Sequence, residues 1–327
     1  MADEVVCTTG RVPDWVHASA SELGVRFVRL DPLDPDAVSG QLRRHRPLGY
    51  LLNWPDLGPF VDADLADAAG GLRIVTYLGQ SPEPAFYVDA LDLDALRDRS
   101  IVVTTAPGAE DAVAESALAF LLAFELRLVP SNLARRNTPT APVAQPRRHG
   151  LTGASLGIVG MGRIGRRVAE LAAAFGMELS YFSRTQRPEV EAALGARFVP
   201  LTELFAACDH VSLHLPMGTT EGMIDAEVLA HASGVTLINT TSLATLVDPE
   251  ALLQALERGN VARVGLEGRY REPYDERLRS YGDERVLLMP PYSSYDTPRT
   301  ERLGWQRYLE SLAAVRRREP VPHRIGA

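Results

Sequence analysis

The chain contains no lysine, and all 34 of its Lys and Arg residues are arginine. This absence excludes Schiff-base chemistry, a P-loop lysine and a lysine general base. Only two cysteines are present, Cys7 and Cys208, and they lie far apart in the sequence. They predict reduced thiols in a cytoplasmic protein, and without clustered His and Cys residues they predict no metal site.

Long apolar runs and an excess of positive charge are also missing. No stretch is long enough to span a bilayer, and the start Met1–Glu4 has no basic segment leading into an apolar run, so we expect no membrane association and no secretory signal. The net charge of −8 and the lack of a basic stripe argue against nucleic acid as a partner. With 327 residues and 46% hydrophobic content, the chain is expected to form two domains. The motifs further along the chain then predict a small-molecule substrate.

The segment 156–165 predicts a dinucleotide site. It reads as an apolar strand that runs into three glycines, Gly160, Gly162 and Gly165. Gly160 permits a tight turn, Gly162 lets the backbone approach a pyrophosphate, and Gly165 lets the next helix pack against the strand. The phosphates would then bind to the free amides at the start of that helix.

The surroundings of the glycines favour this interpretation over an ordinary tight turn. An amphipathic helix at 166–175 and a second apolar strand at 178–182 follow, as a βαβ unit requires. Where NAD-binding proteins carry an acidic residue, the chain has 183–187, Ser-Arg-Thr-Gln-Arg. Because a carboxylate would repel a 2′-phosphate whereas hydroxyl and guanidinium groups bind one, Ser183, Arg184 and Thr185 predict NADP rather than NAD. The alternative is a polar loop whose arginines face water.

Strands and helices alternate along the chain, which predicts an α/β fold in two units. A long helix is expected at 109–128, a crossing loop at 137–145 and a C-terminal amphipathic helix at 300–317 that packs back onto the first unit. Strands are expected near 5–7, 26–28, 49–52, 73–75, 101–103, 156–159, 178–182, 197–199, 210–213, 236–239, 263–266 and 286–289.

With these motifs the chain resembles the D-isomer-specific 2-hydroxyacid dehydrogenases, which include phosphoglycerate dehydrogenase and the glyoxylate or hydroxypyruvate reductases. The resemblance covers nearly the whole chain. It is carried by the segments 106–118, 151–160, 211–216, 237–239, 246–248 and 272–273.

The resemblance implies two Rossmann-like domains with the active site in the cleft between them, and homodimers formed largely through the cofactor domains. A flavodoxin-like substrate domain would comprise 1–105 and 290–327, and a doubly wound NAD(P)-binding domain would comprise 106–289. The serine-arginine-threonine at 183–185 resembles that of the NADPH-preferring members. The resemblance also implies these further cofactor-binding residues: Arg163, Ile164, Leu215, Pro216, Thr240, Thr241 and Glu267.

The chain departs from the family pattern at the catalytic positions. Ser242 stands where the family has its substrate-binding arginine, and Pro291 stands where it has its general acid/base histidine. The carboxylate that would pair with that histidine is present as Glu272, and Glu267 replaces the aspartate near the nicotinamide. Without the arginine and the histidine, oxidation of a 2-hydroxyacid by the family mechanism is not expected.

Replacement groups are available in the sequence. A tyrosine hydroxyl can donate a proton to a developing alkoxide, and Tyr292 and Tyr295 flank the lost histidine, although either could simply pack its ring. Glu272 could act as the acid/base if burial raised its pKa, or it could only cap the turn before Pro273. His214 is interpreted as a structural residue rather than a proton donor.

Three functions remain open from the sequence. The first is an NADP(H)-dependent oxidoreductase that transfers hydride to a carbonyl- or imine-type carbon with Glu272 or Tyr292 as acid/base. The second is a redox-neutral lyase, dehydratase or cyclase that retains a bound nucleotide. The third is a non-catalytic NADP(H)-binding protein. Turnover of NADPH with a substrate separates the first from the second, and binding without any turnover indicates the third.

Overall fold

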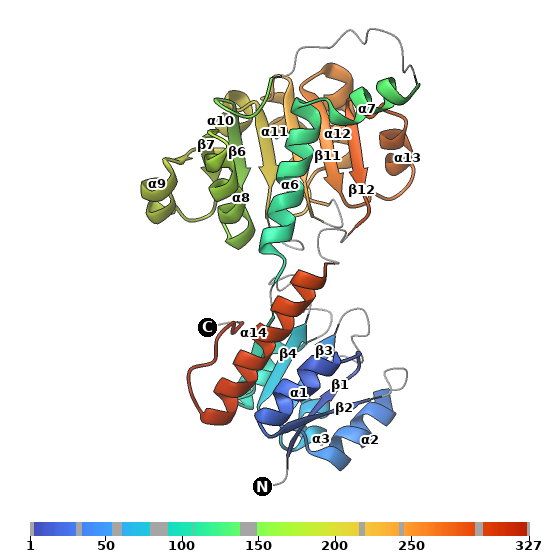
Figure 1. Ribbon diagram of the computed structural model, residues 1–327, viewed down its shortest axis with the longest axis vertical. Coiled ribbons are helices and arrows are strands. Elements are labelled where there is room, and N and C mark those ends of the chain that lie inside the picture. The colour runs from blue at the N-terminus through green and yellow to red at the C-terminus, as the bar shows by residue number, and fades with distance from the viewer. Residues whose placement is uncertain are drawn as a thin grey trace. The chain divides into compact units, whose positions relative to one another are not determined.

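The computed structural model describes residues 3–30, 35–53, 61–78, 91–106, 108–137, 149–215, 220–241, 245–291 and 297–325. The chain divides into two compact units (Figure 1). Unit 1 comprises Met1–Ala109 and Thr297–Ala327, and unit 2 comprises Glu110–Asp296. In the part of the chain that the structure describes, no helix is both long and apolar enough to cross a membrane.

Unit 1 is built on a parallel five-stranded sheet in the order β2-β1-β3-β4-β5, which is the flavodoxin-like order. Its strands are β1 (Glu4–Thr8), β2 (Val25–Arg29), β3 (Gly49–Asn53), β4 (Ile74–Leu78) and β5 (Val102–Thr105). Its helices are α1 (Asp14–Glu22), α2 (Pro35–His45), α3 (Ala63–Ala69), α5 (Leu93–Asp98) and α14 (Pro298–Arg317).

The C-terminal helix α14 packs onto this sheet, as its amphipathic pattern predicts. Trp305, Tyr308 and Leu312 are buried in one core with Val6 and Leu51 of the central strands. Burial of these large side chains removes apolar surface from water and so holds the end of the chain against its beginning.

Unit 2 is built on a parallel seven-stranded sheet in the order β12-β11-β10-β9-β6-β7-β8. Its strands are β6 (Ser155–Val159), β7 (Glu178–Phe182), β8 (Arg197–Phe198), β9 (His210–Leu213), β10 (Val235–Asn239), β11 (Val261–Glu267) and β12 (Val286–Met289). Its helices are α6 (Glu110–Glu125), α7 (Leu128–Asn137), α8 (Arg163–Ala174), α9 (Pro188–Leu194), α10 (Leu201–Ala207), α11 (Ala226–Ala230), α12 (Pro249–Arg258) and α13 (Tyr274–Arg279). The sheet reverses its strand order between β6 and β9, which is where doubly wound folds bind ligands.

Helices cover both faces of this sheet, and small residues let them approach closely. A Cβ on Gly157 of β6 would lie 2.4 Å from Leu204 of α10, and a Cβ on Gly265 of β11 would lie 2.7 Å from the Phe120 ring of α6. Both strands are therefore sandwiched between helices, which explains their nearly continuous apolar sequence. The predicted α/β fold with two Rossmann-like sheets is confirmed.

Two helices differ from the expected limits. Helix α8 begins at Arg163 rather than at 166, directly after the extended residue Gly162. The helix expected at 109–128 ends at Glu125, and α7 starts at Leu128 after Arg127 adopts a left-handed backbone with φ of 50°. Pro130 explains the break, because its ring would clash with the carbonyl of residue 126 in a continuous helix.

Candidate nucleotide site

The glycine turn after β6 has two positions that accept only glycine. Gly160 has φ of +101°, and a Cβ there would lie 2.5 Å from the carbonyl oxygen of His214. A Cβ on Gly165 would lie 1.9 Å from the carbonyl oxygen of Gly160. The first glycine therefore closes the turn against the end of β9, and the third brings α8 against the turn itself.

Gly162 differs from these two because it faces open space. Among the described residues, none lies within 4 Å of the position its Cβ would take. Gly162 is the N-cap of α8, and a glycine has no side chain that could cap the amides of the first turn. The turn thus offers uncapped amides and the positive end of a 12-residue helix, as a phosphate-binding turn requires.

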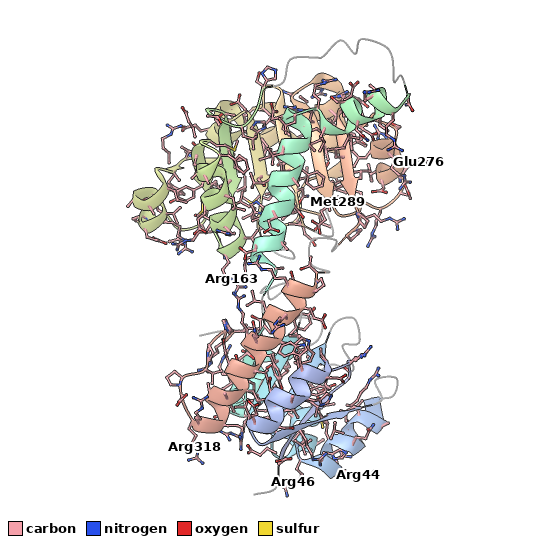
Figure 2. All side chains as sticks on the ribbon, viewed as in Figure 1. Arg44, Arg46, Arg163, Glu276, Met289 and Arg318 are labelled. Atoms are coloured by element: carbon pink, nitrogen blue, oxygen red, sulfur yellow. The ribbon has the colours of Figure 1, made fainter. Side chains whose placement is uncertain are left out.

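Ion pairs connect the start of α8 to the start of α6. Arg163 Nε lies 3.3 Å from Glu110 Oε1, and Arg167 Nε lies 2.7 Å from Asp111 Oδ1. Figure 2 shows Arg163 at the end of α8 that carries the glycine turn. The guanidinium of Arg163 remains half-exposed there, so it is available to a phosphate group at the turn.

The loop that follows β7 lies beside the glycine turn. The amide of Gly160 donates to the carbonyl oxygen of Phe182 at 2.8 Å, and Ser183 follows immediately. The Ser183 hydroxyl donates to the carbonyl oxygen of Thr185 at 2.5 Å, while Arg184 is exposed. The loop places hydroxyl and guanidinium groups, and no carboxylate, at the position where a nucleotide ribose binds in this fold.

Buried polar atoms gather where β10 and β11 end. The Asn239 side-chain oxygen accepts from the Thr241 amide at 3.0 Å, but among the described residues its Nδ2 has no hydrogen-bond partner, and neither has the Thr245 hydroxyl. Thr240 and Glu267, at the same edge of the sheet, are also buried. Buried polar atoms normally have partners, so a free donor at this edge suits a polar ligand group. The sequence contained its signal, an asparagine at the end of an apolar strand, but whether its amide finds a partner depends on the folded environment.

His214 follows β9 at the switch point of the sheet. Its Nε2 lies 2.8 Å from the Ser212 hydroxyl, and desolvation lowers the pKa of the ring to about 3. The imidazole is therefore neutral at pH 7 and cannot act there as a proton donor in its charged form. The backbone carbonyl oxygen of His214 is the atom that leaves no space for a Cβ on Gly160.

Glu272 is not in the buried, apolar surroundings that raise the pKa of a carboxyl group. Its side chain is 47% exposed, it pairs with Arg279 at 2.7 Å, and its Oε2 accepts from the Glu276 amide at 2.9 Å. The Arg279 hydrogen bond and that amide hold the pKa of Glu272 below its ordinary value. The condition under which Glu272 could act as the acid/base, a pKa raised by burial, is therefore not met, and the carboxylate caps the start of α13.

Several predicted site residues lie outside the described residues: Pro216, Ser242, Tyr292 and Tyr295. Pro291 is described as part of a turn after β12. Leu215 is half-buried, and its Cδ2 would lie 3.1 Å from a Cβ on Gly160. The structure therefore brings the glycines, Leu215 and the 183–185 loop together, while the residues around the lost histidine remain predictions.

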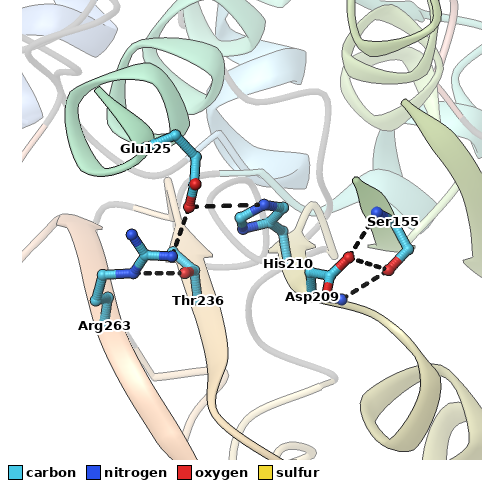
Figure 3. Close-up of polar contacts among 6 residues, drawn as sticks. All are labelled: Glu125, Ser155, Asp209, His210, Thr236 and Arg263. Atoms are coloured by element: carbon cyan, nitrogen blue, oxygen red, sulfur yellow. Dashed lines mark hydrogen bonds and ion pairs between the residues drawn. The ribbon is translucent and has the colours of Figure 1, made fainter. Parts of the chain in front are cut away.

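A second polar cluster lies at the opposite edge of the same sheet, where strands β9 to β11 begin (Figure 3). Buried Glu125 accepts from Arg263 Nη2 at 2.5 Å and lies 3.9 Å from His210 Nε2, and Arg263 Nε donates to the Thr236 hydroxyl at 3.0 Å. Burial is the main cause that lowers the pKa of His210. Arg263 joins Glu125 to Thr236, whereas the buried His210 Nδ1 has no hydrogen-bond partner among the described residues. We interpret the cluster as structural. The described residues contain no group of His, Cys, Asp and Glu that could hold a metal ion.

The sheet order and the glycine turn define unit 2 as a Rossmann-type dinucleotide-binding fold. Residues 118–293 match the model of the D-isomer specific 2-hydroxyacid dehydrogenase NAD binding domain. The chain is 34% identical to glyoxylate reductase of Korarchaeum cryptofilum over 81% of this chain and 80% of that protein. It is 36% identical to glyoxylate reductase of Thermococcus litoralis over 72% of this chain and 71% of that protein.

A solved structure agrees with these relatives. The crystal structure of a glyoxylate reductase from Paecilomyes thermophila superimposes with a TM-score of 0.79 at 25% identity, over 100% of this chain and 99% of that one. The chain therefore belongs to the D-isomer-specific 2-hydroxyacid dehydrogenase family, as its motifs indicate. That family is one of oxidoreductases, and this chain carries its NAD-binding domain.

Proposed function

We propose that the protein is an NADP(H)-dependent oxidoreductase that transfers hydride to a carbonyl- or imine-type carbon. The observation that carries this proposal is the loop 183–187, which lies beside the glycine turn and contains two arginines, two hydroxyl groups and no carboxylate. Planar guanidinium groups suit a phosphate dianion, whereas a carboxylate at this position would suit the bare ribose of NAD. Relatives named glyoxylate reductase support a carbonyl substrate.

The residues present fit such a cofactor. Gly160 and Gly165 close the turn, and the amides after Gly162 would bind the pyrophosphate together with Arg163. Ser183, Arg184 and Thr185 would bind the 2′-phosphate. The remaining contacts are proposed for Ile164, Leu215, Pro216, Thr240, Thr241 and Glu267, together with the amide of Asn239, which has no partner among the described residues. When bound, the nicotinamide supplies or accepts the hydride.

Proton transfer must use a group other than the family histidine, because Pro291 carries no titratable group and Ser242 carries no positive charge. We propose that the Tyr292 hydroxyl donates the proton to the oxygen or nitrogen of the substrate. Glu272 is a weaker candidate, because an exposed carboxylate with a lowered pKa holds no proton near pH 7.

We also propose that the protein forms a homodimer. No residue of α7 is buried, and Leu126, Leu128 and Leu133 are exposed in the α6–α7 region. An apolar surface of this kind suits an interface between two copies. Light scattering on the purified protein measures the mass directly.

A substrate screen tests the proposed function. NADPH oxidation at 340 nm is followed with a panel of 2-keto acids, aldehydes and imines, and product is measured separately by mass spectrometry. NADPH consumption in proportion to product supports the oxidoreductase. Product without net NADPH consumption supports a redox-neutral enzyme, and nucleotide binding without any product supports a binding protein.

A further inference from the structure

The hydroxyl of Tyr181 forms a hydrogen bond with the end of the loop 183–187. Tyr181 belongs to β7, and its ring is buried in the core between the sheet and helices α6 and α8. Its hydroxyl accepts a hydrogen bond from the Arg187 amide at 2.6 Å and lies 2.7 Å from Glu191 Oε1. Because a phenol has one proton and the amide already donates to its oxygen, that proton goes to Glu191.

Glu191 completes this support from helix α9. Its two carboxylate oxygens accept from Gln186 Nε2 at 2.9 Å and 3.1 Å. Burial is the main cause that raises the pKa of Tyr181, so the phenol keeps its proton at pH 7 and the hydrogen bond persists. One carboxylate thus ties the end of the loop to the strand before it.

Hydrogen bonds hold the chain before the loop, within it and at its end. Before the loop, the Phe182 carbonyl oxygen accepts from the Gly160 amide, and in its middle the Ser183 hydroxyl donates to the Thr185 carbonyl oxygen. At its end the Arg187 amide donates to Tyr181. A loop that is already ordered loses little conformational entropy when it binds a ligand.

The charges of the loop point to an anionic ligand group. Arg184 and Arg187 are exposed, and neither forms an ion pair with another described residue. The nearby carboxylate of Glu191 is occupied by Tyr181 and Gln186. Two guanidinium groups on a fixed loop beside a phosphate-binding turn suit a second phosphate.

We propose that Tyr181 and Glu191 are positioning residues that set the preference for a nucleotide carrying a 2′-phosphate. This inference rests on the proposed use of NADP(H). Tyr181 and Glu191 do not contact the phosphate themselves; they hold the backbone of 183–187 in the conformation that presents the two arginines to it. Loss of either side chain should weaken the binding of NADPH. The affinity for NADH should not change, because NADH has no 2′-phosphate to contact the loop.

Calorimetric titration of the full-length protein with NADPH and NADH tests this inference. Tyr181→Phe keeps the ring and removes both hydrogen bonds of the hydroxyl, so NADPH should bind about fivefold more weakly, which is in the range expected for the loss of one hydrogen bond. The affinity for NADH should change by less than about twofold. Glu191→Gln retains an acceptor for Tyr181 and should keep the preference for NADPH, whereas Glu191→Ala should lose it as Tyr181→Phe does.

The matched control is Tyr281→Phe, which removes a hydroxyl from another tyrosine of unit 2 whose ring contacts Arg285. Equal weakening of both nucleotides by Tyr181→Phe, or no change in either, would overturn the positioning role. Failure of Glu191→Gln to restore the preference that Glu191→Ala loses would do the same. Wild-type protein that does not prefer NADPH over NADH overturns the proposed cofactor itself, and that result is obtained before any variant is made.

Discussion

The amide of Gly160 and the carbonyl oxygen of Phe182 form a 2.8 Å hydrogen bond that joins the glycine turn to the end of β7. This contact places two segments side by side that lie some twenty residues apart in the sequence. One offers the amides of a helix start, and the other offers hydroxyl and guanidinium groups. Together they define where the two phosphate-bearing parts of a dinucleotide would bind.

Alanine substitutions at Gly165 and Gly162 should affect different properties, the first the stability of the protein and the second its affinity for NADPH. Gly165→Ala places a methyl group 1.9 Å from the Gly160 carbonyl oxygen, so the free energy of unfolding should fall by at least about 2 kcal/mol. Gly162→Ala meets no described residue, so stability should stay within about 1 kcal/mol of wild type. The same Gly162→Ala change should weaken NADPH binding at least about tenfold, because the methyl group would occupy the place of a phosphate oxygen. Urea unfolding and calorimetry measure the two effects, and a stable Gly165→Ala variant would contradict the tight turn.

Acidification should destabilise the protein through His214. Its pKa is about 3 in the folded protein against an ordinary value of 6.5, so below pH 6.5 the unfolded chain binds a proton that the folded chain does not. The free energy of unfolding should therefore fall by about 1.4 kcal/mol from this group between pH 7.5 and 5.5. His214→Asn should reduce the pH dependence by that amount. The exposed His231, changed to Asn, is the control, and identical pH profiles for wild type and His214→Asn would refute the prediction.

Glu125 should matter for stability and not for nucleotide binding. Glu125→Ala leaves Arg263 without its buried carboxylate partner, which should cost about 3 kcal/mol in urea unfolding. Because the cluster lies where β9 to β11 begin, whereas the glycine turn follows the end of β6, the affinity for NADPH should not change. A variant with wild-type stability, or one with selectively impaired binding, would show that the cluster is not purely structural.

Tyr292→Phe should lower turnover at least about 100-fold once a substrate is found, because a general acid contributes this much or more. The affinity for NADPH should stay at the wild-type value. Tyr281→Phe is the matched control and should leave both quantities unchanged. Wild-type turnover by Tyr292→Phe would show that Tyr292 is not the proton donor. A 100-fold loss of turnover in Tyr295→Phe instead would assign that role to Tyr295.

Local patterns in the sequence were sufficient to predict the strands, the glycine turn and the family. The three glycines act within a few residues of one another, so their spacing alone carries the geometry of the turn. The break between α6 and α7 was not predicted, because the apolar pattern continues to Leu128, although Pro130 carries a signal for it. The extended backbone of Gly162 explains why α8 starts earlier than its apolar periodicity indicates.

Features that depend on tertiary contacts could not be predicted in this way. The exposure of Glu272 and its pairing with Arg279 depend on how α13 packs after β11. The free amide of Asn239 and the support of Tyr181 by Glu191 depend on which atoms meet in the folded unit. Sequence spacing places these residues near the site but does not reveal their partners.

The most direct test of the account is calorimetric titration of the purified protein with NADPH, NADP, NADH and NAD, repeated with Arg184→Ala. Arg258→Ala is the control, because Arg258 is an exposed arginine at the end of α12, which leads into the opposite edge of the sheet. The account predicts about micromolar binding of NADPH and NADP that Arg184→Ala loses and Arg258→Ala keeps. Equal binding of phosphorylated and unphosphorylated nucleotides, or no binding of any of the four, would contradict it.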